Sequence, residues 1–248
     1  MQSLDRAVQV LDVLSKSADG MPITELSDRI GLSLSTTHRF LQSLSNNDLV
    51  VQDPISRRYK LGLRLLSLAS GLLKSDRLLE LSRETMQRAA VLSGNVVYLC
   101  KQQNKEIVCV SATNPVDDII PSFVVQVGNT LPAHAGAAAK IILAYQPEAF
   151  LRGLLRELSP LPQYTKKTTT DIDSVLLDFK RCRELGYALC DEEIHLGVIA
   201  VAAPIFNYDG TVLGSIGVTC VKAHTSVPSL INTIRDSAKE ISRLMGYN

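Results

Sequence analysis

The sequence predicts an α+β protein with a small helical part at its amino end and a larger part of mixed strands and helices. Apolar residues recur at helical spacing over residues 4–44, whereas beyond residue 94 short apolar runs typical of strands alternate with helical segments. Of the 248 residues, 46% are apolar and 21% are charged, so the chain can bury a core and is not a disordered polymer. This length corresponds to one large or two ordinary domains.

The amino-terminal part is predicted to begin with three helices. The first starts almost at Met1, and its apolar face carries Leu4, Ala7, Val8, Leu11 and Leu14. The second is short, and its apolar face carries Ile23, Leu26 and Ile30. Gly31 then suits the positive φ of a helix C-cap, and the Ser33 hydroxyl can cap the next helix. That third helix is expected to reach about Asn46, and its inward residues are Leu34, Thr37, Phe40, Leu41 and Leu44.

The third helix carries polar side chains on its first turns. Two short helices joined by a glycine-containing turn are typical of a helix-turn-helix, whose second helix can enter a DNA major groove. Serine and threonine can bond bases or phosphates, and Arg39 can bond guanine or phosphate. The alternative is a capped surface helix of any small bundle, and this stretch alone does not favour either interpretation.

A basic hairpin after the third helix favours DNA binding. Leu49–Val51 and Arg58–Lys60 read as strands around a turn at 53–56, and the hairpin carries Arg57, Arg58 and Lys60. Such a wing can reach the phosphate backbone, although a basic solvated hairpin would look the same. With all four elements in order, we predict a winged helix-turn-helix. The DNA-binding residues are predicted to be Thr24, Ser33, Ser35, Thr36, His38, Arg39, Ser43, Arg57 and Arg58.

A leucine-rich helix over residues 61–76 is predicted to follow the wing. Because it is apolar on more than one side, it must be buried against a dimer partner or against the next domain. Ser75 can cap a further helix that runs to Ser93 and ends at Gly94. We therefore divide the chain into a DNA-binding domain over 1–60, a linker helix over 61–75 and a second domain over 76–248.

The second domain is predicted to be one antiparallel-rich sheet flanked by helices. The expected strands are two around a polar turn at 103–105, a third over 122–128, a fourth over 187–191, and a hairpin turned at 207–210. The expected helices are an Ala-rich one over 135–144, a shorter one after Pro147, one over 171–185, and a last one from Pro228 to near Gly246, with a loop at 159–170.

Composition excludes several classes of protein. The five cysteines are odd in number and no pair is spaced C-x-x-C, which argues against a disulfide framework and a zinc ribbon. The net charge of +1 excludes a histone-like protein. We see no signal peptide, and no apolar run approaches the roughly 20 residues that cross a bilayer. The expected protein is soluble and cytoplasmic, binds no membrane, and needs no cofactor.

Other side-chain clusters suggest chemistry only weakly. Cys190 and His195 could be a nucleophile and its base, but their spacing does not secure contact and no third group orients them. A metal could gather His134, Cys190, His195 and Cys220, yet the spacing fits no zinc pattern. We predict no catalytic residue and no metal site. Residues 190–193, Cys-Asp-Glu-Glu, are expected to form a solvated acidic turn.

Several motifs, in order, resemble the IclR family of bacterial transcription regulators. The amino-terminal part carries "SLDRAVQVLDVL", "ITELSDRIGLSLSTTHRFLQSL" and "RRYKLGLRLLSL". The carboxy-terminal part carries "LPAHAGAAAKIILA", "RELGYALCDEEIHLGVIAVAAPIF" and "EISRLMGY". The resemblance covers nearly the whole chain and is far more specific than a lone helix-turn-helix.

The resemblance implies a winged helix-turn-helix joined by a linker helix to a GAF-like effector-binding domain. It further implies a homodimer or homotetramer on a palindromic double-stranded operator, controlled by a small organic-acid or aromatic effector. A repressor is expected rather than an activator. The alternatives are an enzyme or metal-binding sensor with an accessory DNA-binding domain, and a structural nucleoid protein without a ligand, whose binding would show little sequence preference.

The effector site is predicted at the start of the Ala-rich helix. Small residues over 135–139 leave backbone N–H groups that can hold a carboxylate, although the sequence alone favours close packing of this helix on the sheet, and only the family resemblance favours the ligand site. The resemblance places amide donors at Ala137 and Ala138. The other pocket positions are Leu131, Cys190, Val198, Ala200, Gly217 and Thr219.

The predicted pocket departs from the family pattern. Cys190 stands where an acid can occur, Ala200 where a cysteine can occur, and Gly217 where a serine can occur. Ala139 replaces a usual glycine, and Gly136 replaces a usual serine. These residues predict a less polar pocket, suited to an effector with an apolar body and one carboxylate.

Overall fold

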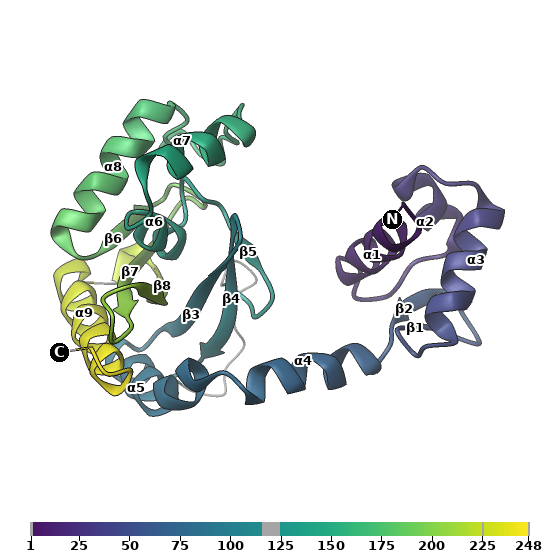
Figure 1. Ribbon diagram of the computed structural model, residues 1–248, viewed down its shortest axis with the longest axis horizontal. Helices are drawn as coiled ribbons and strands as arrows, with labels where there is room; N and C mark the ends of the chain where they lie inside the picture. The colour runs from purple at the N-terminus through teal and green to yellow at the C-terminus, as the bar shows by residue number, and fades with distance from the viewer. Residues whose placement is uncertain (1, 116–124, 225, 248) are drawn as a thin grey trace. The chain divides into compact units, whose positions relative to one another are not determined.

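The computed structural model describes residues 2–115, 125–224 and 226–247. The chain divides into two compact units, Met1–Asp76 and Arg77–Asn248, which are treated separately below (Figure 1). None of the helices in the described ranges is long and apolar enough to cross a membrane.

The amino-terminal unit has the predicted order of helices and hairpin. Its elements are α1 (Gln2–Ser15), α2 (Ile23–Ile30), α3 (Leu34–Ser45), β1 (Val50–Gln52), β2 (Tyr59–Leu61) and α4 (Arg64–Lys74). Gly31 closes α2 at a φ of +65°, and its N–H is directed to carbonyls of the last turn. Ser33 caps α3, because its Oγ accepts the N–H of Thr36 at 3.3 Å. The local signals for the turn between the two helices are confirmed.

A small apolar core holds this unit together. Its buried members are Val10, Leu14, Met21, Leu26, Leu41, Leu44, Val50 and Tyr59. Thr37 is fully buried as predicted, and its hydroxyl has no hydrogen-bond partner within the described residues. Leu34 was predicted to face inward, which is wrong, since half of it is exposed. It is the first residue of α3, one turn before Thr37, and the apolar core does not extend to this end of the helix.

Helix α4 has the predicted apolar character but no residue of it is buried. Its exposed leucines are Leu66, Leu68, Leu72 and Leu73, and Leu63 just before the helix is exposed as well. The predicted role of Ser75 is also wrong, because its hydroxyl donates to Leu72 O at 3.0 Å and therefore completes α4 instead of opening the next helix.

The carboxy-terminal unit is an α+β domain built on one six-stranded sheet. Its strands are β3 (Val96–Gln103), β4 (Glu106–Thr113), β5 (Thr130–Leu131), β6 (Ala188–Asp191), β7 (Val198–Phe206) and β8 (Val212–Val221). Neighbouring strands pair antiparallel in the order β5-β4-β3-β8-β7-β6. Its helices are α5 (Arg77–Ser93), α6 (Ala137–Leu143), α7 (Glu148–Glu157), α8 (Ile172–Leu185) and α9 (Val227–Leu244), with a short 3₁₀ turn, η1, at Lys222–His224.

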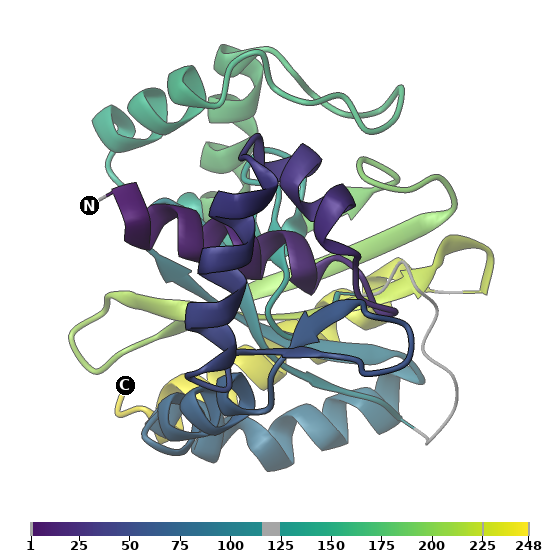
Figure 2. The ribbon, with the colours of Figure 1, turned by 90° about the vertical axis from the view of Figure 1, so that its right-hand side faces the viewer.

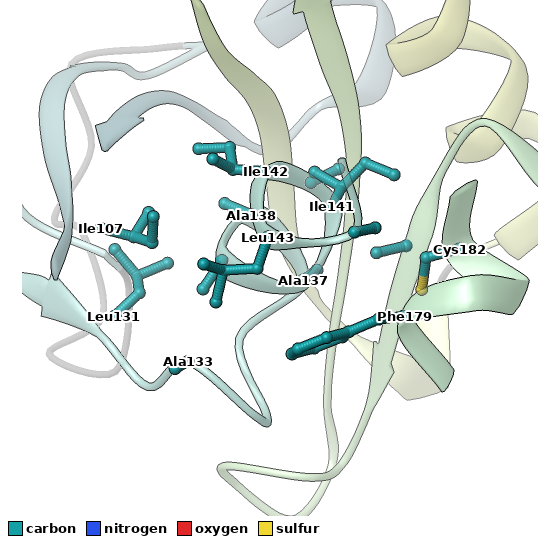
Figure 3. Packing of buried hydrophobic residues seen from close by; sticks show 14 of the residues in the cluster. Ile107, Leu131, Ala133, Ala137, Ala138, Ile141, Ile142, Leu143, Phe179 and Cys182 are labelled. Carbon is teal, nitrogen blue, oxygen red and sulfur yellow. The ribbon is translucent and has the colours of Figure 1, made fainter. Parts of the chain in front are cut away.

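Two layers of helices cover the sheet. Helices α5 and α9 pack on one face, whereas α6, backed by α7 and α8, packs on the other (Figures 1 and 2). All seven residues of α6 are buried, and its Ile141, Ile142 and Leu143 meet Phe179 of α8 and the sheet (Figure 3). Lys140 shares this buried helix, so its ammonium group requires partners inside the protein.

One predicted strand differs from the structure. Of residues 122–128, the first three lie outside the described residues, and 125–128 form part of a turn. Gly128, at a φ of +89°, donates its N–H to Cys109 O at 2.8 Å, which aligns Thr130 with Val108. The strand therefore starts later, at Thr130, because the glycine reverses the chain first.

Candidate functional site

The amino-terminal unit exposes a polar face at the start of α3. The hydroxyl of Ser33 lies 3.1 Å from that of Ser35 and 2.9 Å from that of Thr36, so these three groups form one cluster. The side chains of His38 and Arg39 are exposed and have no hydrogen bond or ion pair within the described residues. The predicted DNA-binding residues Thr24 and Ser43 are also exposed.

The wing residues Arg57 and Arg58 have different environments. Arg57 is exposed and lies in the left-handed region, at a φ of +58°. Arg58 is half-buried, and its Nε donates to Gly20 O at 3.1 Å, which ties the hairpin to the chain before α2. The hairpin turn that precedes them is stabilised by Asp53, whose pKa is lowered because its carboxylate accepts hydrogen bonds from Ser56.

The carboxy-terminal unit contains a cavity of about 540 Å³ beside the start of α6. Six of the eight predicted effector residues line it: Leu131, Ala137, Cys190, Val198, Ala200 and Thr219. Ala138 and Gly217 do not. Ala138 is fully buried, and its carbonyl accepts the hydroxyl of Ser215 at 3.3 Å. Gly217 lies behind another lining residue, Tyr98.

Gly217 is required by the position of the Tyr98 ring. The two residues are direct partners across β3 and β8. A Cβ built on Gly217 would lie 2.7 Å from Cζ and 2.8 Å from the hydroxyl oxygen of Tyr98. A serine at this position would therefore collide with the ring, so glycine here and tyrosine at 98 form a matched pair.

More than half of the cavity lining is apolar, and its polar side chains include His195. Within the described residues that line it, there is no lysine, arginine, aspartate or glutamate. Thr219 is 5% exposed, and its Oγ1 has no hydrogen-bond partner in the described structure. Burial raises the pKa of Tyr98 well above its usual value. The nearby Thr219 hydroxyl lowers the pKa of Tyr98, but by less than burial raises it. The two hydroxyl groups are nevertheless not placed so that they form a hydrogen bond. A buried hydroxyl without a partner is costly, and a ligand would satisfy it.

Cys190 and His195 both line this cavity, although the sequence did not secure their proximity. Burial raises the pKa of the Cys190 thiol to about 11, so at neutral pH the sulfur stays protonated. A protonated thiol is a poor nucleophile, which argues against acyl-transfer chemistry by this pair.

The β6–β7 loop, which carries Ile194 and His195 into the cavity wall, is fastened by a buried cation. Lys140 Nζ donates to both carboxylate oxygens of Glu193, at 2.8 and 3.0 Å, and lies 2.9 Å from Asp178. Burial alone lowers the pKa of Lys140, but the two carboxylates together raise it above its usual value. Burial raises the pKa of Glu193, and Lys140 offsets this only partly because Asp178 adds a second negative charge.

The other acid of this loop is also held. Glu192 pairs with Lys167 and Lys222 and accepts the N–H of Gly197 at 2.8 Å. The Lys167 pair is the largest cause that lowers the pKa of Glu192 to about 2. The predicted solvated acidic turn is therefore wrong, since only 15% of the Glu193 side chain and 17% of the Glu192 side chain are exposed. The fold brings lysines from distant parts of the sequence to both acids, Lys140 to Glu193 and Lys167 with Lys222 to Glu192.

Two of the four residues considered for a metal, His134 and Cys220, lie away from the cavity wall that Cys190 and His195 share. His134 places Nε2 2.9 Å from Pro162 O and stacks on Tyr164, and Cys220 directs its sulfur to Ile199 O. Nowhere in the described ranges do three His, Cys, Asp or Glu side chains gather as metal ligands would.

Sequence reasoning did not identify Tyr98, Asn129 and Ile194 as lining residues. One signal pointed to Tyr98, because it is the only aromatic residue in β3. No local signal marks Asn129 or Ile194, since turns that depend on distant contacts bring them to the cavity.

Comparison with family models gives two matches. The model described as "Bacterial transcriptional regulator IclR C-terminal" matches residues 70–243. The model described as "IclR helix-turn-helix domain" matches residues 3–54.

Named relatives match over nearly the full chain. The transcriptional regulator XynR of Escherichia coli is 29% identical, with 100% of this chain and 98% of XynR covered. The transcriptional repressor AllR of Escherichia coli is 27% identical, with 99% and 90% covered.

Solved structures share the fold. An IclR transcriptional regulator from Alicyclobacillus acidocaldarius superimposes with a TM-score of 0.84 at 27% identity, covering 99% of both chains. An IclR homolog from Microbacterium hydrocarbonoxydans, complexed with 4-hydroxybenzoate, gives a TM-score of 0.81 at 22% identity, covering 98% of both chains.

Proposed function

Because the chain belongs to the IclR family of bacterial transcriptional regulators, and is thus a DNA-binding regulator, we propose that it is a cytoplasmic repressor controlled by a small-molecule effector. The observation that carries the effector proposal is the cavity of about 540 Å³ with the buried, unpartnered hydroxyl of Thr219 in its wall. Cavities of this size with few polar groups are typical ligand sites. The repressor assignment follows the name of the relative AllR.

The proposed effector has an apolar or aromatic body and one carboxylate. Mostly apolar residues surround the cavity, so a highly charged ligand would lose its hydration without compensation. Ala137 lines the cavity at the start of α6. The N-cap residue before it, Gly136, has no side chain that could bond the first backbone N–H groups of the helix, so those groups are left for a carboxylate. The Microbacterium protein binds a hydroxylated aromatic acid, which is a molecule of this kind.

DNA recognition is assigned to α3 and the wing. Ser35, Thr36, His38 and Arg39 would face base edges in the major groove, flanked by Thr24, Ser33 and Ser43, with Arg57 and Arg58 on phosphates. A homodimer or homotetramer would read a palindromic operator, with half-sites separated by about 34 Å or a multiple of it.

The exposed leucines of α4 are assigned to self-association, and residues 61–75 to the link between a DNA-binding domain at 1–60 and an effector domain at 76–248. Leu66 is 68% exposed, so Leu66→Glu should alter assembly or the effector response without unfolding the chain. Leu177→Glu is a matched control, because Leu177 on α8 is 69% exposed. Sedimentation of both variants tests this, and an unchanged mass and response for Leu66→Glu would refute it.

DNA binding is tested with the fragment upstream of the protein's own gene. Fluorescence anisotropy at modest salt should show specific binding that Arg39→Ala weakens by about 1–3 kcal/mol. Arg181→Ala removes the same charge from the exposed side of α8 and should leave affinity unchanged. If neither the fragment bound nor Arg39→Ala mattered, the assignment of α3 would fail.

Effector binding is tested by calorimetric titration of the full chain with a panel of aromatic and aliphatic acids. Thr219→Val keeps the shape of the side chain and removes the hydroxyl. It should therefore lower the affinity for whichever acid binds, while preserving the stability of the protein. Tight binding only of highly polar compounds without a carboxylate would contradict the proposal. Turnover of any of these acids would contradict our further proposal that the protein is not an enzyme.

A further inference from the structure

A second cavity, of about 320 Å³, lies where the last helix crosses the sheet. Residues of α9 and β7 line it, together with Tyr145, which follows α6. None of the predicted effector residues contributes to it, and its lining shares no residue with the cavity beside α6. Its chemistry therefore has to be explained separately.

Aromatic rings form one wall of this second cavity. The ring of Phe206 meets Tyr145 edge to face at 5.2 Å and stacks on Tyr247 at 4.9 Å. The polar group beneath them, the Ser242 hydroxyl, is already satisfied, since it donates to Ala238 O and accepts the N–H of Phe206. This wall therefore offers ring surface, and it is suited to a flat apolar body.

Cations also line this cavity. Arg235, Lys239 and Arg243 follow one another at intervals of four residues on α9, so they share one helix face, and all three line the cavity. No carboxylate side chain lines it within the described residues. Lys239 has only a loose contact to Asp236, at 3.9 Å, and both are largely exposed.

The pKa of the nearby acid Glu240 is lowered mainly by Arg88, with a smaller contribution from Arg243. Glu240 is paired with Arg88 of α5, at 2.5 Å. A further guanidinium, that of Arg183, lies 5.3 Å above the ring of Tyr145. Like charges at this helical spacing repel one another, and an anion in the cavity would relieve the repulsion. The whole chain carries a net charge of only +1, so the positive charge is a local feature.

We propose that this cavity is a second ligand site, for a planar aromatic anion that carries one or two carboxylates. The ring packs on Phe206 and Tyr247, and the carboxylates meet Arg243 and Lys239 at the rim, with Arg235 deeper along the helix. The volume suits a single substituted ring. Arginine favours this pairing, because its planar fork bonds both oxygens of a carboxylate.

The test uses benzene-1,3-dicarboxylate and the full chain. Calorimetric titration should show binding, and the double variant Lys239→Gln with Arg243→Gln should weaken it by about tenfold or more. Cyclohexane-1,3-dicarboxylate has the same charges without a flat ring and should bind more weakly, and benzyl alcohol, which lacks the charge, should not bind.

Thr219→Val separates this site from the cavity beside α6. Binding of the probe should survive Thr219→Val, whereas its loss would place the probe in the other cavity and overturn the proposal. Equal affinity of the double variant and the unmodified protein would overturn it as well. If the probe did not bind and the double variant changed the sedimenting mass, the face would be a contact between copies of the chain, and the proposal would be wrong.

Discussion

The two units of this protein differ in where they hold the polar groups proposed to be functional, on the surface in the first unit and in the interior in the second. In the amino-terminal unit, His38, Arg39 and Arg57 project outward from a core of eight buried apolar residues. In the carboxy-terminal unit, Thr219 and Lys140 are buried at 5% and 1% exposure. The difference follows from the size of the partner, because a DNA duplex meets side chains that reach it from a surface, whereas a small molecule needs an enclosed site.

This contrast has an energetic consequence. An exposed polar side chain remains hydrated when it has no partner, so changing it has little effect on folding. A buried one depends on its protein partners, and removing a partner leaves a desolvated group. Substitutions of exposed side chains without protein partners in the first unit should therefore change DNA affinity alone, whereas removing a buried group that has protein partners, such as Lys140, should lower stability.

The largest expected effect is that of Lys140→Met. The change leaves Glu193 and Asp178 facing each other without their cation, which should lower the free energy of unfolding by about 3–5 kcal/mol. Tyrosine fluorescence during urea unfolding reports this, because there is no tryptophan and six of the seven tyrosines, all except Tyr59, lie beyond residue 77. Lys180→Met is the control, since Lys180 is exposed on the same α8 that carries Asp178. Equal stability of both variants would show that the pairing of Lys140 with Glu193 and Asp178 is dispensable.

Gly217→Ser should have the next largest effect. Its Cβ would overlap the Tyr98 ring, so overpacking should lower the free energy of unfolding by about 1–3 kcal/mol. The double variant Gly217→Ser with Tyr98→Leu should recover part of that loss, because leucine leaves room for the serine Cβ where the tyrosine ring stood. Urea unfolding of the two single variants and the double variant measures this coupling, and strictly additive effects would mean that the two residues do not share the space.

Arg57→Ala and Arg58→Ala should have different effects. The first should change DNA affinity alone, and the second should change both DNA affinity and stability. Each should reduce the slope of log affinity for DNA against log salt by about 1, as the loss of one phosphate contact does. Only Arg58→Ala should also destabilise the amino-terminal unit, by about 1 kcal/mol, because its Nε bonds Gly20 O. Anisotropy over a salt series and thermal unfolding provide the two measurements. A similar loss of stability for Arg57→Ala would remove the distinction.

The smallest effect concerns pH and Glu192. The folded pKa of about 2 lies below the usual 4.5, so the stability that this carboxylate contributes is complete above pH 4.5 and is lost as pH falls toward 2. At pH 6 the unmodified protein should therefore have a higher Tm than the Glu192→Gln variant, and this difference in Tm should shrink toward pH 3. A difference that stayed constant over this range would show that the ion pairs to Lys167 and Lys222 do not matter.

The sequence predicted most of the elements because their signals are local. Gly31 and Ser33 marked the turn between α2 and α3, and a polar turn marked the hairpin of β3 and β4. Two of the errors share a physical origin, since Leu34 and Ser75 sit at helix ends, where the extent of the core or a competing hydrogen bond decides the outcome.

The candidate cavity was predictable only in part. The family resemblance suggested Cys190 and Thr219, which line it, whereas Tyr98 and Ile194 became visible only in the folded chain. The loop that carries Ile194 depends on Lys140, which lies 53 residues before its partner Glu193. No spacing rule connects residues that far apart.

The sequence by itself determined which segments become helices and strands, which helix presents polar groups, and to which family the motifs point, because propensity, capping and periodicity act over a few residues. Only the tertiary structure decided which side chains share a cavity, that Gly217 makes room for Tyr98, and that the acids after β6 are half-buried and paired. Those outcomes depend on burial and on charges brought together from distant parts of the chain, and such energies exist only after the sheet and helices have packed.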